Sequence, residues 1–289
     1  LTMNGQAVRV PHKSVVDIMQ EHIKDRRIWF SLEFFLPYTD SGSEDLIGMI
    51  DYFVGRKPLF YSIVSRCNST EPMATGPPVA EMGDKSVRRR KITNSTDMAD
   101  VMVNFCAVET VLHVCWINET PTSMRGSLAK SMRGSLAKSA RNGVRTLFVV
   151  RGDCPNEKIC AQNGQGNTPV EEEPFTDTVQ FIKFIRKEFG NQFSIGVPGY
   201  PEGHIEGTSY HHCLGYLKEK IDSGADFIIS QIFFEADTFV SFIRDCRSIG
   251  IKCPILPSIL PISSYNAFCR IMNNCQVNVP VSVSEALER

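Results

Sequence analysis

The sequence has no long apolar run, no excess of charge of one sign and no paired cysteine motif, and each absence excludes a class of protein. No apolar stretch approaches the length of about 18 residues that a membrane-spanning helix needs, so we predict no membrane-spanning segment. The formal net charge of −1 argues against nucleic acid or an anionic membrane surface as the main partner. The ten cysteines include no Cys-x-x-Cys pair, which argues against a zinc site and favours reduced thiols in a cytoplasmic protein.

Short β-rich runs alternate with helical segments along the 289 residues, a pattern that predicts an α/β protein with a parallel sheet. The predicted strands are Ile28–Phe35, Leu59–Ser65, Thr110–Trp116, Thr146–Arg151, Phe193–Val197, Asp226–Phe233 and Pro254–Pro257. The predicted helices are Glu44–Val54, Ser123–Arg141, Thr176–Phe189, Tyr210–Ser223, Ala236–Ser248 and Tyr265–Met272. This alternation is typical of a (βα)8 barrel of the TIM type, which fills a chain of this length as a single domain.

The seven predicted strands are one fewer than such a barrel needs. Residues 284–289 resemble the start of another helix, so we expect a barrel that is cut before its last βα unit. Residues 1–27 are expected to form an N-terminal helical extension, and residues 28–289 the barrel domain. A doubly wound open sheet is the alternative, but no G-x-G-x-x-G motif follows the first predicted strand, which disfavours that fold.

The most apolar short run of the chain, Ile28–Pro37, carries one carboxylate, Glu33. Pro37 closes the run, as proline closes a strand, so we interpret the run as a buried strand. Burial disfavours the charged form of a carboxyl group and therefore raises its pKa. A glutamate in such a place holds its proton near neutral pH, and Glu33 is accordingly predicted to act as a general acid.

Further candidate residues, polar except for Gly152, fall near the C-terminal ends of predicted strands, where the active site of a parallel barrel lies. They are His113 in the third strand, Arg151, Gly152 and Asp153 after the fourth, Tyr200 and His204 after the fifth, and Gln231 in the sixth. Each group also has an ordinary structural explanation, such as a satisfied core histidine, a simple turn or a Pro-Gly turn. Their convergence on one end of the predicted barrel favours a single binding site.

A perfect tandem repeat occupies residues 123–138, because Ser123–Lys130 recurs residue for residue as Ser131–Lys138. Eight additional residues rotate the remainder of a helix by roughly 80°, so a helix cannot absorb them and keep the same face toward the core. We expect one copy to loop out or to extend the end of the helix. We interpret the repeat as a duplication without a function of its own.

The chain resembles the methylenetetrahydrofolate reductases in segments spread from about Trp29 to Pro280. The matching segments, which follow the family's order, are Leu32–Pro37, Leu112–Cys115, Val149–Asp153, Gly199–His204, Gly224–Phe234 and Ile259–Pro261. The resemblance implies a TIM-barrel flavoenzyme of the cytoplasm that serves one-carbon and methionine metabolism and forms a homo-oligomer when full length. It further implies that FAD takes a hydride from NAD(P)H and passes it to 5,10-methylenetetrahydrofolate, which gives 5-methyltetrahydrofolate.

The resemblance also implies a role for each matched residue. Glu33 matches the family's general acid, which helps to open the five-membered ring of the folate. Asp153 matches a carboxylate that contacts both flavin and folate, and Gln231 matches an amide that binds the folate. The positions that match FAD-binding residues are His113, Arg151, Gly152, Asp153, Tyr200, His204 and Lys220.

Two residues depart from the family pattern near the expected cofactor. Val64 stands where the family usually has a threonine at the end of the second strand, and Cys213 stands where it usually has an aspartate. Each departure removes an expected contact with FAD. Together with the missing strand and the duplication, they favour to some degree an alternative in which the chain is an impaired or inert fragment. Another flavin-barrel dehydrogenase is a further alternative, although it would not need this set of Glu, Asp and Gln.

Overall fold

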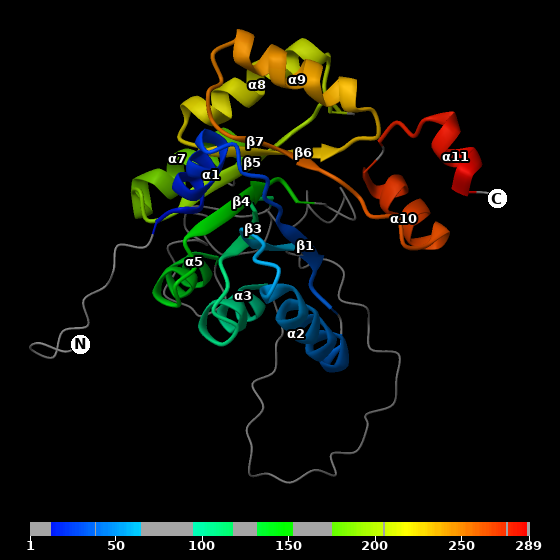
Figure 1. The fold of residues 1–289 in the computed structure, drawn as a ribbon. Coiled ribbons are helices and arrows are strands. Elements are labelled where there is room, and N and C mark those ends of the chain that lie inside the picture. The colour runs from blue at the N-terminus through cyan, green and yellow to red at the C-terminus, as the bar shows by residue number, and fades with distance from the viewer. Residues whose placement is uncertain are drawn as a thin grey trace, which may run out of the picture.

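The computed structural model describes residues 13–37, 39–64, 95–117, 132–152, 175–204, 206–275 and 277–287. Its seven strands form one parallel sheet in which each strand pairs with the next along the chain. The strands are β1 (Leu32–Phe35), β2 (Tyr61–Val64), β3 (Thr110–Cys115), β4 (Thr146–Val150), β5 (Ser194–Gly199), β6 (Phe227–Ile232) and β7 (Ile255–Ser258). The sheet curls into part of a barrel with helices on its outer side (Figure 1), which confirms the predicted TIM-barrel type of fold.

Helices follow the strands in alternation. They are α1 (Val15–Lys24), α2 (Asp40–Val54), α3 (Ser95–Asn104), α5 (Met132–Arg141), α7 (Thr178–Phe189), α8 (Tyr210–Asp222), α9 (Ala236–Ser248), α10 (Tyr265–Cys275) and α11 (Val281–Leu287). Of these, α2, α7, α8, α9 and α10 lie close to their predicted ranges. The second copy of the octapeptide enters α5 at Met132, whereas the first copy lies outside the described residues. Across the ranges given above, no helix is both long and apolar enough to cross a membrane.

Helix α3 was not predicted, although it has a clear apolar face. Met98, Ala99 and Met102 are buried there, at the spacing that places side chains on one side of a helix. Met98 and Met102 pack with Tyr61 and Ile63 of β2 in a cluster that also includes residues of α2, whereas Ala99 packs in the larger core cluster. The helices α2 and α3 therefore fix β1 and β2 from the outer side of the sheet.

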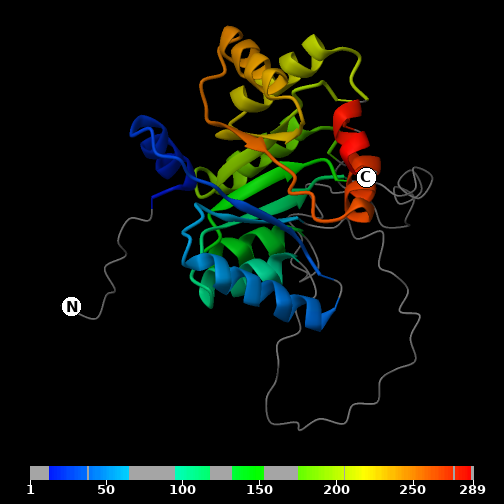
Figure 2. The ribbon, with the colours of Figure 1, turned by 45° about the vertical axis from the view of Figure 1, so that its right-hand side comes forward.

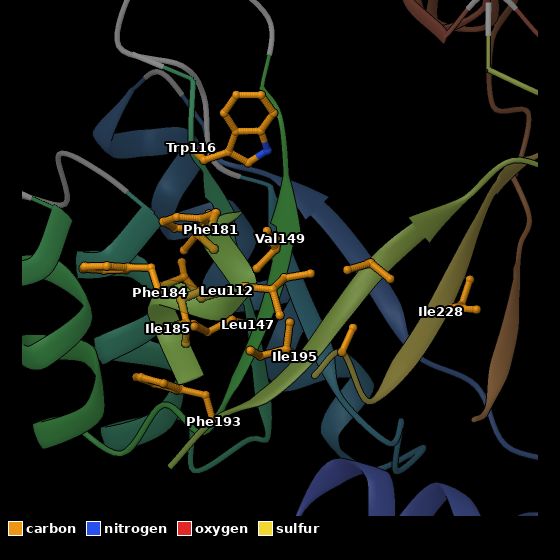
Figure 3. Packing of buried hydrophobic residues seen from close by; sticks show 14 of the residues in the cluster. Leu112, Trp116, Leu147, Val149, Phe181, Phe184, Ile185, Phe193, Ile195 and Ile228 are labelled. Atoms are coloured by element: carbon orange, nitrogen blue, oxygen red, sulfur yellow. The ribbon is translucent and has the colours of Figure 1, made fainter. Parts of the chain in front are cut away.

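The core lies on both faces of the sheet. On the outer face, Leu112, Leu147 and Ile195 pack against Phe181 and Ile185 of α7, as Figure 3 shows. On the inner face, a smaller cluster is formed by Phe60, Val111, Phe148, Phe227 and Leu256, with Val15 and Met19 of α1 packed into it. Figure 2 places α1 at the end of the sheet opposite the arrowheads. Apolar side chains thus fill the N-terminal end of the inner face, and the C-terminal ends of the strands remain for polar residues.

Candidate functional site

Three polar side chains from neighbouring strands meet on the inner face of the sheet: Glu33 of β1, Ser62 of β2 and His113 of β3. The parallel register pairs Glu33 with Ser62, and Ser62 with Val111, two residues before His113. Because residues two apart on a strand share a face, the three side chains point the same way. His113 Nε2 lies 2.7 Å from Ser62 Oγ and 3.3 Å from Glu33 Oε2.

The three side chains differ in their exposure to solvent. Ser62 and His113 are 1% and 5% exposed, and the His113 ring packs on Phe148 with the ring centroids 4.8 Å apart. The side chain of Glu33, in contrast, is 46% exposed. The carboxyl group is therefore held by two buried neighbours on one side and remains open on the other, where a ligand could contact it.

The predicted burial of Glu33 and the predicted rise in its pKa are wrong for the protein alone. Desolvation does act to raise the pKa, but the hydrogen bond to His113, the charge of His113 and the hydrogen bond to Ser62 together lower it below its ordinary value. The strand is also shorter than predicted, since only Leu32–Phe35 pairs with β2 and Ile28 is fully exposed. The physical reason is that β1 forms an edge of the sheet in the described part of the chain, so its inner face is only partly covered.

A second group of predicted site residues lies beyond the end of β5 and on α8. The rings of Tyr200 and His204 meet edge to face, with centroids 4.6 Å apart. Lys220 Nζ lies 5.9 Å from the centroid of the Tyr200 ring and 4.8 Å from that of Tyr216. Lys220 is only 5% exposed, and this burial lowers its pKa to about 8. The group therefore offers a desolvated amine bordered by aromatic faces.

Arg151, directly after β4, is linked to this second group through Glu206. The guanidinium donates two hydrogen bonds to the Glu206 carboxylate, one of them 2.9 Å long, and both side chains are about half exposed. Hydrogen bonding to Arg151 holds the pKa of Glu206 below its ordinary value. The backbone N–H of Glu206 donates to His204 Nδ1 at 3.1 Å, and desolvation lowers the pKa of His204 despite the nearby Glu206 carboxylate.

Of the remaining predicted residues, Gln231 and Gly152 lie in the described part of the chain. Gln231 is half-buried at a β-bulge, where the register of β6 with β7 shifts between Ile229 and Ile232, and its Oε1 accepts a hydrogen bond of 2.9 Å from the Ile232 N–H. Gly152 has a φ of 86°, a left-handed conformation that favours glycine. Asp153 lies outside the described residues, so its predicted contacts with flavin and folate stay predictions.

Two site residues were missed by the sequence analysis. Ser62 carried a usable signal, because the parallel register places this hydroxyl of β2 beside Glu33. Glu206 carried none, since its partner Arg151 is 55 positions away and the pair depends on the path of a loop. Cys213, one of the two departures from the family pattern, accepts a hydrogen bond at its Sγ from the His204 N–H at 3.4 Å. It therefore lies in the second group, beside predicted cofactor-binding residues.

A shallow groove of about 450 Å³ is lined by none of the predicted site residues, although Pro201 in its lining directly follows Tyr200. Its lining residues are Pro201, Tyr210, Asp237, Thr238, Ser241 and Asp245, and the Tyr210 hydroxyl donates to Asp245 at 2.8 Å. The groove borders α9 and contains none of the residues that carry acid–base or cationic chemistry in the two groups above. We therefore place the candidate site at the inner face of β1–β3 and at the described residues that follow β4 and β5.

Comparison with known proteins identifies relatives along almost the whole chain. Residues 18–289 match the family model described as methylenetetrahydrofolate reductase. The chain is 32% identical to a probable methylenetetrahydrofolate reductase (NADH) of Oryza sativa subsp. japonica, over 95% of this chain and 42% of the relative. It is 35% identical to a probable methylenetetrahydrofolate reductase (NADPH) of Caenorhabditis elegans, over 92% of this chain and 35% of the relative.

A bacterial relative is more similar in length. The 5,10-methylenetetrahydrofolate reductase of Escherichia coli (strain K12) is 27% identical over 96% of this chain and 80% of the relative. The chain therefore spans less than half the length of the plant and nematode relatives but most of the bacterial one. Since the family match covers residues 18–289, which include all seven described strands, this chain belongs to the methylenetetrahydrofolate reductase family.

Proposed function

We propose that this chain reduces 5,10-methylenetetrahydrofolate to 5-methyltetrahydrofolate, with FAD as its bound cofactor and NAD(P)H as the electron donor. The observation that carries the proposal is the placement of Glu33. Its half-exposed carboxyl group lies on the inner face of the sheet, held by Ser62 and His113. A carboxyl group that is held by protein side chains on one side and exposed to solvent on the other is suited to exchange a proton with a bound substrate.

The residues present fit FAD by their chemistry. The pyrophosphate of FAD requires cationic or N–H donors, which Arg151 and Lys220 supply, and its ring systems require flat apolar contacts, which Tyr200 and His204 supply. When bound, FAD would supply the redox chemistry that moves a hydride from NAD(P)H to the folate. His113 and Gly152 would complete the FAD-binding set, as the family resemblance implies.

The lowered pKa of Glu33 constrains how this residue can act. A general acid must hold a proton, whereas the hydrogen bonds to His113 and Ser62 favour the ionised form in the protein alone. A folate and a flavin placed against the exposed side of the carboxyl would remove its remaining water, and desolvation raises the pKa of a carboxyl group. Glu33 would then take up a proton from solvent as the ligands bind, and donate it to the folate ring as that ring opens.

Asp153 and Gln231 would hold the folate beside this acid. The amide of Gln231 can both donate and accept hydrogen bonds, as the pterin edge requires. A cytoplasmic location, a role in one-carbon and methionine metabolism and a homo-oligomeric full-length protein are further parts of the proposal. The seven cysteines in the described ranges form no disulfide with one another, which supports the proposed location in a reducing compartment.

The visible spectrum of the purified protein tests the proposal. We expect the absorption of bound oxidised flavin, its loss on anaerobic addition of NADPH or NADH, and its return on addition of methylenetetrahydrofolate. A protein that stays colourless after incubation with FAD would contradict the proposal and support the inert-fragment alternative. That alternative is favoured by the two sheet edges, β1 and β7, that remain unpaired with each other in the described part of the chain.

A further inference from the structure

Ser62 occupies a position between the two ionisable groups of the inner face. Its hydroxyl lies 2.7 Å from His113 Nε2, which in turn lies 3.3 Å from Glu33 Oε2, and the parallel register places Ser62 directly beside Glu33. Glu33 and His113 belong to strands that do not pair with each other, because β2 lies between them. Ser62 is therefore the residue of the intervening strand that connects the acid to the imidazole.

We propose that Ser62 is a positioning residue, whose hydroxyl joins the His113 ring to the Glu33 carboxyl group and fixes that carboxyl group in the orientation from which it exchanges a proton. The inference deepens the proposed function and rests on it for its catalytic meaning. The structural part of the inference, that Ser62 orients the Glu33 carboxyl group, does not depend on any bound flavin or folate.

The chemistry of a hydroxyl suits this role. A serine can donate one hydrogen bond and accept another at the same time. When Glu33 is ionised, Ser62 can donate to the carboxylate while it accepts from an Nε2–H of His113. When Glu33 carries a proton, the same hydroxyl can accept from the carboxyl group and donate to an unprotonated Nε2. Ser62 thus satisfies both partners in both states without movement of a strand.

Burial makes the role of Ser62 hard to replace. The residue is 1% exposed, and the His113 ring beside it is fixed by its contact with Phe148. Water therefore has little access to substitute for a missing hydroxyl. Among the described residues, the side chains that act on the Glu33 carboxyl group are Ser62 of β2 and the titratable His113 of β3, the two strands that follow β1 in the sheet. Loss of the hydroxyl removes one of these two partners.

The test is a titration of the Glu33 carboxyl group in the protein alone, by isotope-edited infrared spectroscopy or carboxyl-carbon NMR, with Glu33→Gln to assign the signal. In the wild type, we expect Glu33 to remain ionised at acidic pH values where exposed glutamates already take up protons. In Ser62→Ala, the uptake should move to higher pH, because desolvation still opposes the charge while one stabilising hydrogen bond is lost. Unchanged proton uptake in this variant would overturn the proposal.

A matched control separates this effect from the loss of any buried hydroxyl. Thr146 is fully buried on β4, in register with Val111 on the same inner face, and its Oγ1 has no hydrogen-bond partner among the described residues. Thr146→Val should leave the proton uptake of Glu33 at the wild-type pH. An equal shift in Thr146→Val and Ser62→Ala would show a general change in packing and would contradict the role of Ser62. If Ser62→Ala fails to fold, Ser62→Cys keeps nearly the same volume, and the weak hydrogen bonding of a thiol predicts a shift in the same direction.

The catalytic consequence has a separate readout. In the flavin-loaded protein, Ser62→Ala should move the pH dependence of folate reduction to higher pH, while the rate of flavin reduction by NAD(P)H stays within about twofold of the wild type. Equal losses in both half-reactions at all pH values would point to a distorted barrel and overturn the positioning role. If the wild type binds no flavin, the proposed function fails, yet the carboxyl titration still decides the structural role of Ser62.

Discussion

His113 and Glu33 face each other across the intervening strand β2, with Nε2 of the imidazole 3.3 Å from Oε2 of the carboxylate. The buried ring thereby supports an acid whose side chain is 46% exposed. This relationship explains why the most apolar run of the sequence tolerates a carboxylate. It also makes the protonation of Glu33 dependent on two neighbours that the sequence places far away, at positions 62 and 113.

The pH dependence of stability should report this pair. Because the folded-state pKa of Glu33 is lowered, its contribution to stability is present above its ordinary value of 4.5 and is lost as the pH falls through the lower, folded-state pKa. Urea unfolding of the wild type and Glu33→Gln should therefore give free energies that differ more at neutral pH than at acidic pH. A difference that grows as the pH falls would mean that the pKa of Glu33 is raised in the folded protein.

Lys220 gives a second prediction about the pH dependence of stability, this time for a buried amine rather than a carboxyl group. Burial lowers its pKa from 10.5 to about 8, so the unfolded chain binds more protons than the folded one between these values. The wild type should therefore gain stability relative to Lys220→Met as the pH rises from about 8 toward 10.5, by about 3 kcal/mol at most. Thermal or urea unfolding at several pH values measures this gain.

Lys218 on the same helix is the matched control for Lys220. It forms an exposed ion pair with Asp222 one helical turn away. Lys218→Met should cost less than about 1 kcal/mol and should show no gain between the same pH values. In flavin titrations, Lys220→Met should weaken FAD binding by about tenfold or more, whereas Lys218→Met should not. Equal effects of the two substitutions would contradict a cofactor-binding role for Lys220.

The pair of Arg151 and Glu206 predicts an effect on cofactor affinity rather than on stability. Both side chains are about half exposed, so the loss of their ion pair should change the free energy of unfolding by less than about 1 kcal/mol. Glu206→Gln removes a carboxylate that competes with an anionic ligand for the Arg151 guanidinium. We therefore expect FAD to bind a few-fold more tightly, as measured by quenching of flavin fluorescence. Weaker binding would mean that Glu206 orients Arg151 for the cofactor.

The inner face of β5 should tolerate no additional atom at Gly196. A Cβ atom there would lie 2.6 Å from Cε2 of Phe227 and 2.9 Å from Cδ2 of Phe148, in the cluster that fills the barrel interior. Gly196→Ala should therefore destabilise the protein by about 1–3 kcal/mol in urea unfolding. As a control, Gly48→Ala in α2 meets no atom within 4 Å and should be neutral or stabilising by up to about 1 kcal/mol. Similar stabilities for the two variants would show that the inner face is loosely packed.

The sequence predicts the architecture well because the apolar periodicity of strands and helices is a local property. The seven strands were recognised from runs such as Thr110–Cys115, whose residues are all buried. Helix α3 was missed because its buried apolar face is short and rests on Met98, Ala99 and Met102. The solvent exposure of Glu33 was harder to predict, because it depends on which residues pack beside β1 at the edge of the sheet.

Candidate site residues could be selected from residue type and strand position. Features of the site that depend on tertiary contacts could not be predicted from the sequence. Glu33 and His113 were expected to converge at one end of the barrel with the other candidate residues, and the structure brings these two side chains into contact. The direction of the pKa shift of Glu33 was not predictable, because it depends on the partners Ser62 and His113 rather than on the surrounding apolar sequence. The link from Arg151 through Glu206 to His204 depends on the conformation of the loop after β5.

The central claim is that Glu33 acts as the acid in folate reduction and not in flavin reduction. The most direct measurement is a stopped-flow comparison of the two half-reactions in Glu33→Gln, because glutamine keeps the size of the side chain but cannot donate the acidic proton. We predict that the reduction of bound flavin by NAD(P)H proceeds within about threefold of the wild-type rate, and that reoxidation by methylenetetrahydrofolate slows by a factor of about 100 or more. A similar loss in both half-reactions, or an unchanged rate of reoxidation, would contradict the account.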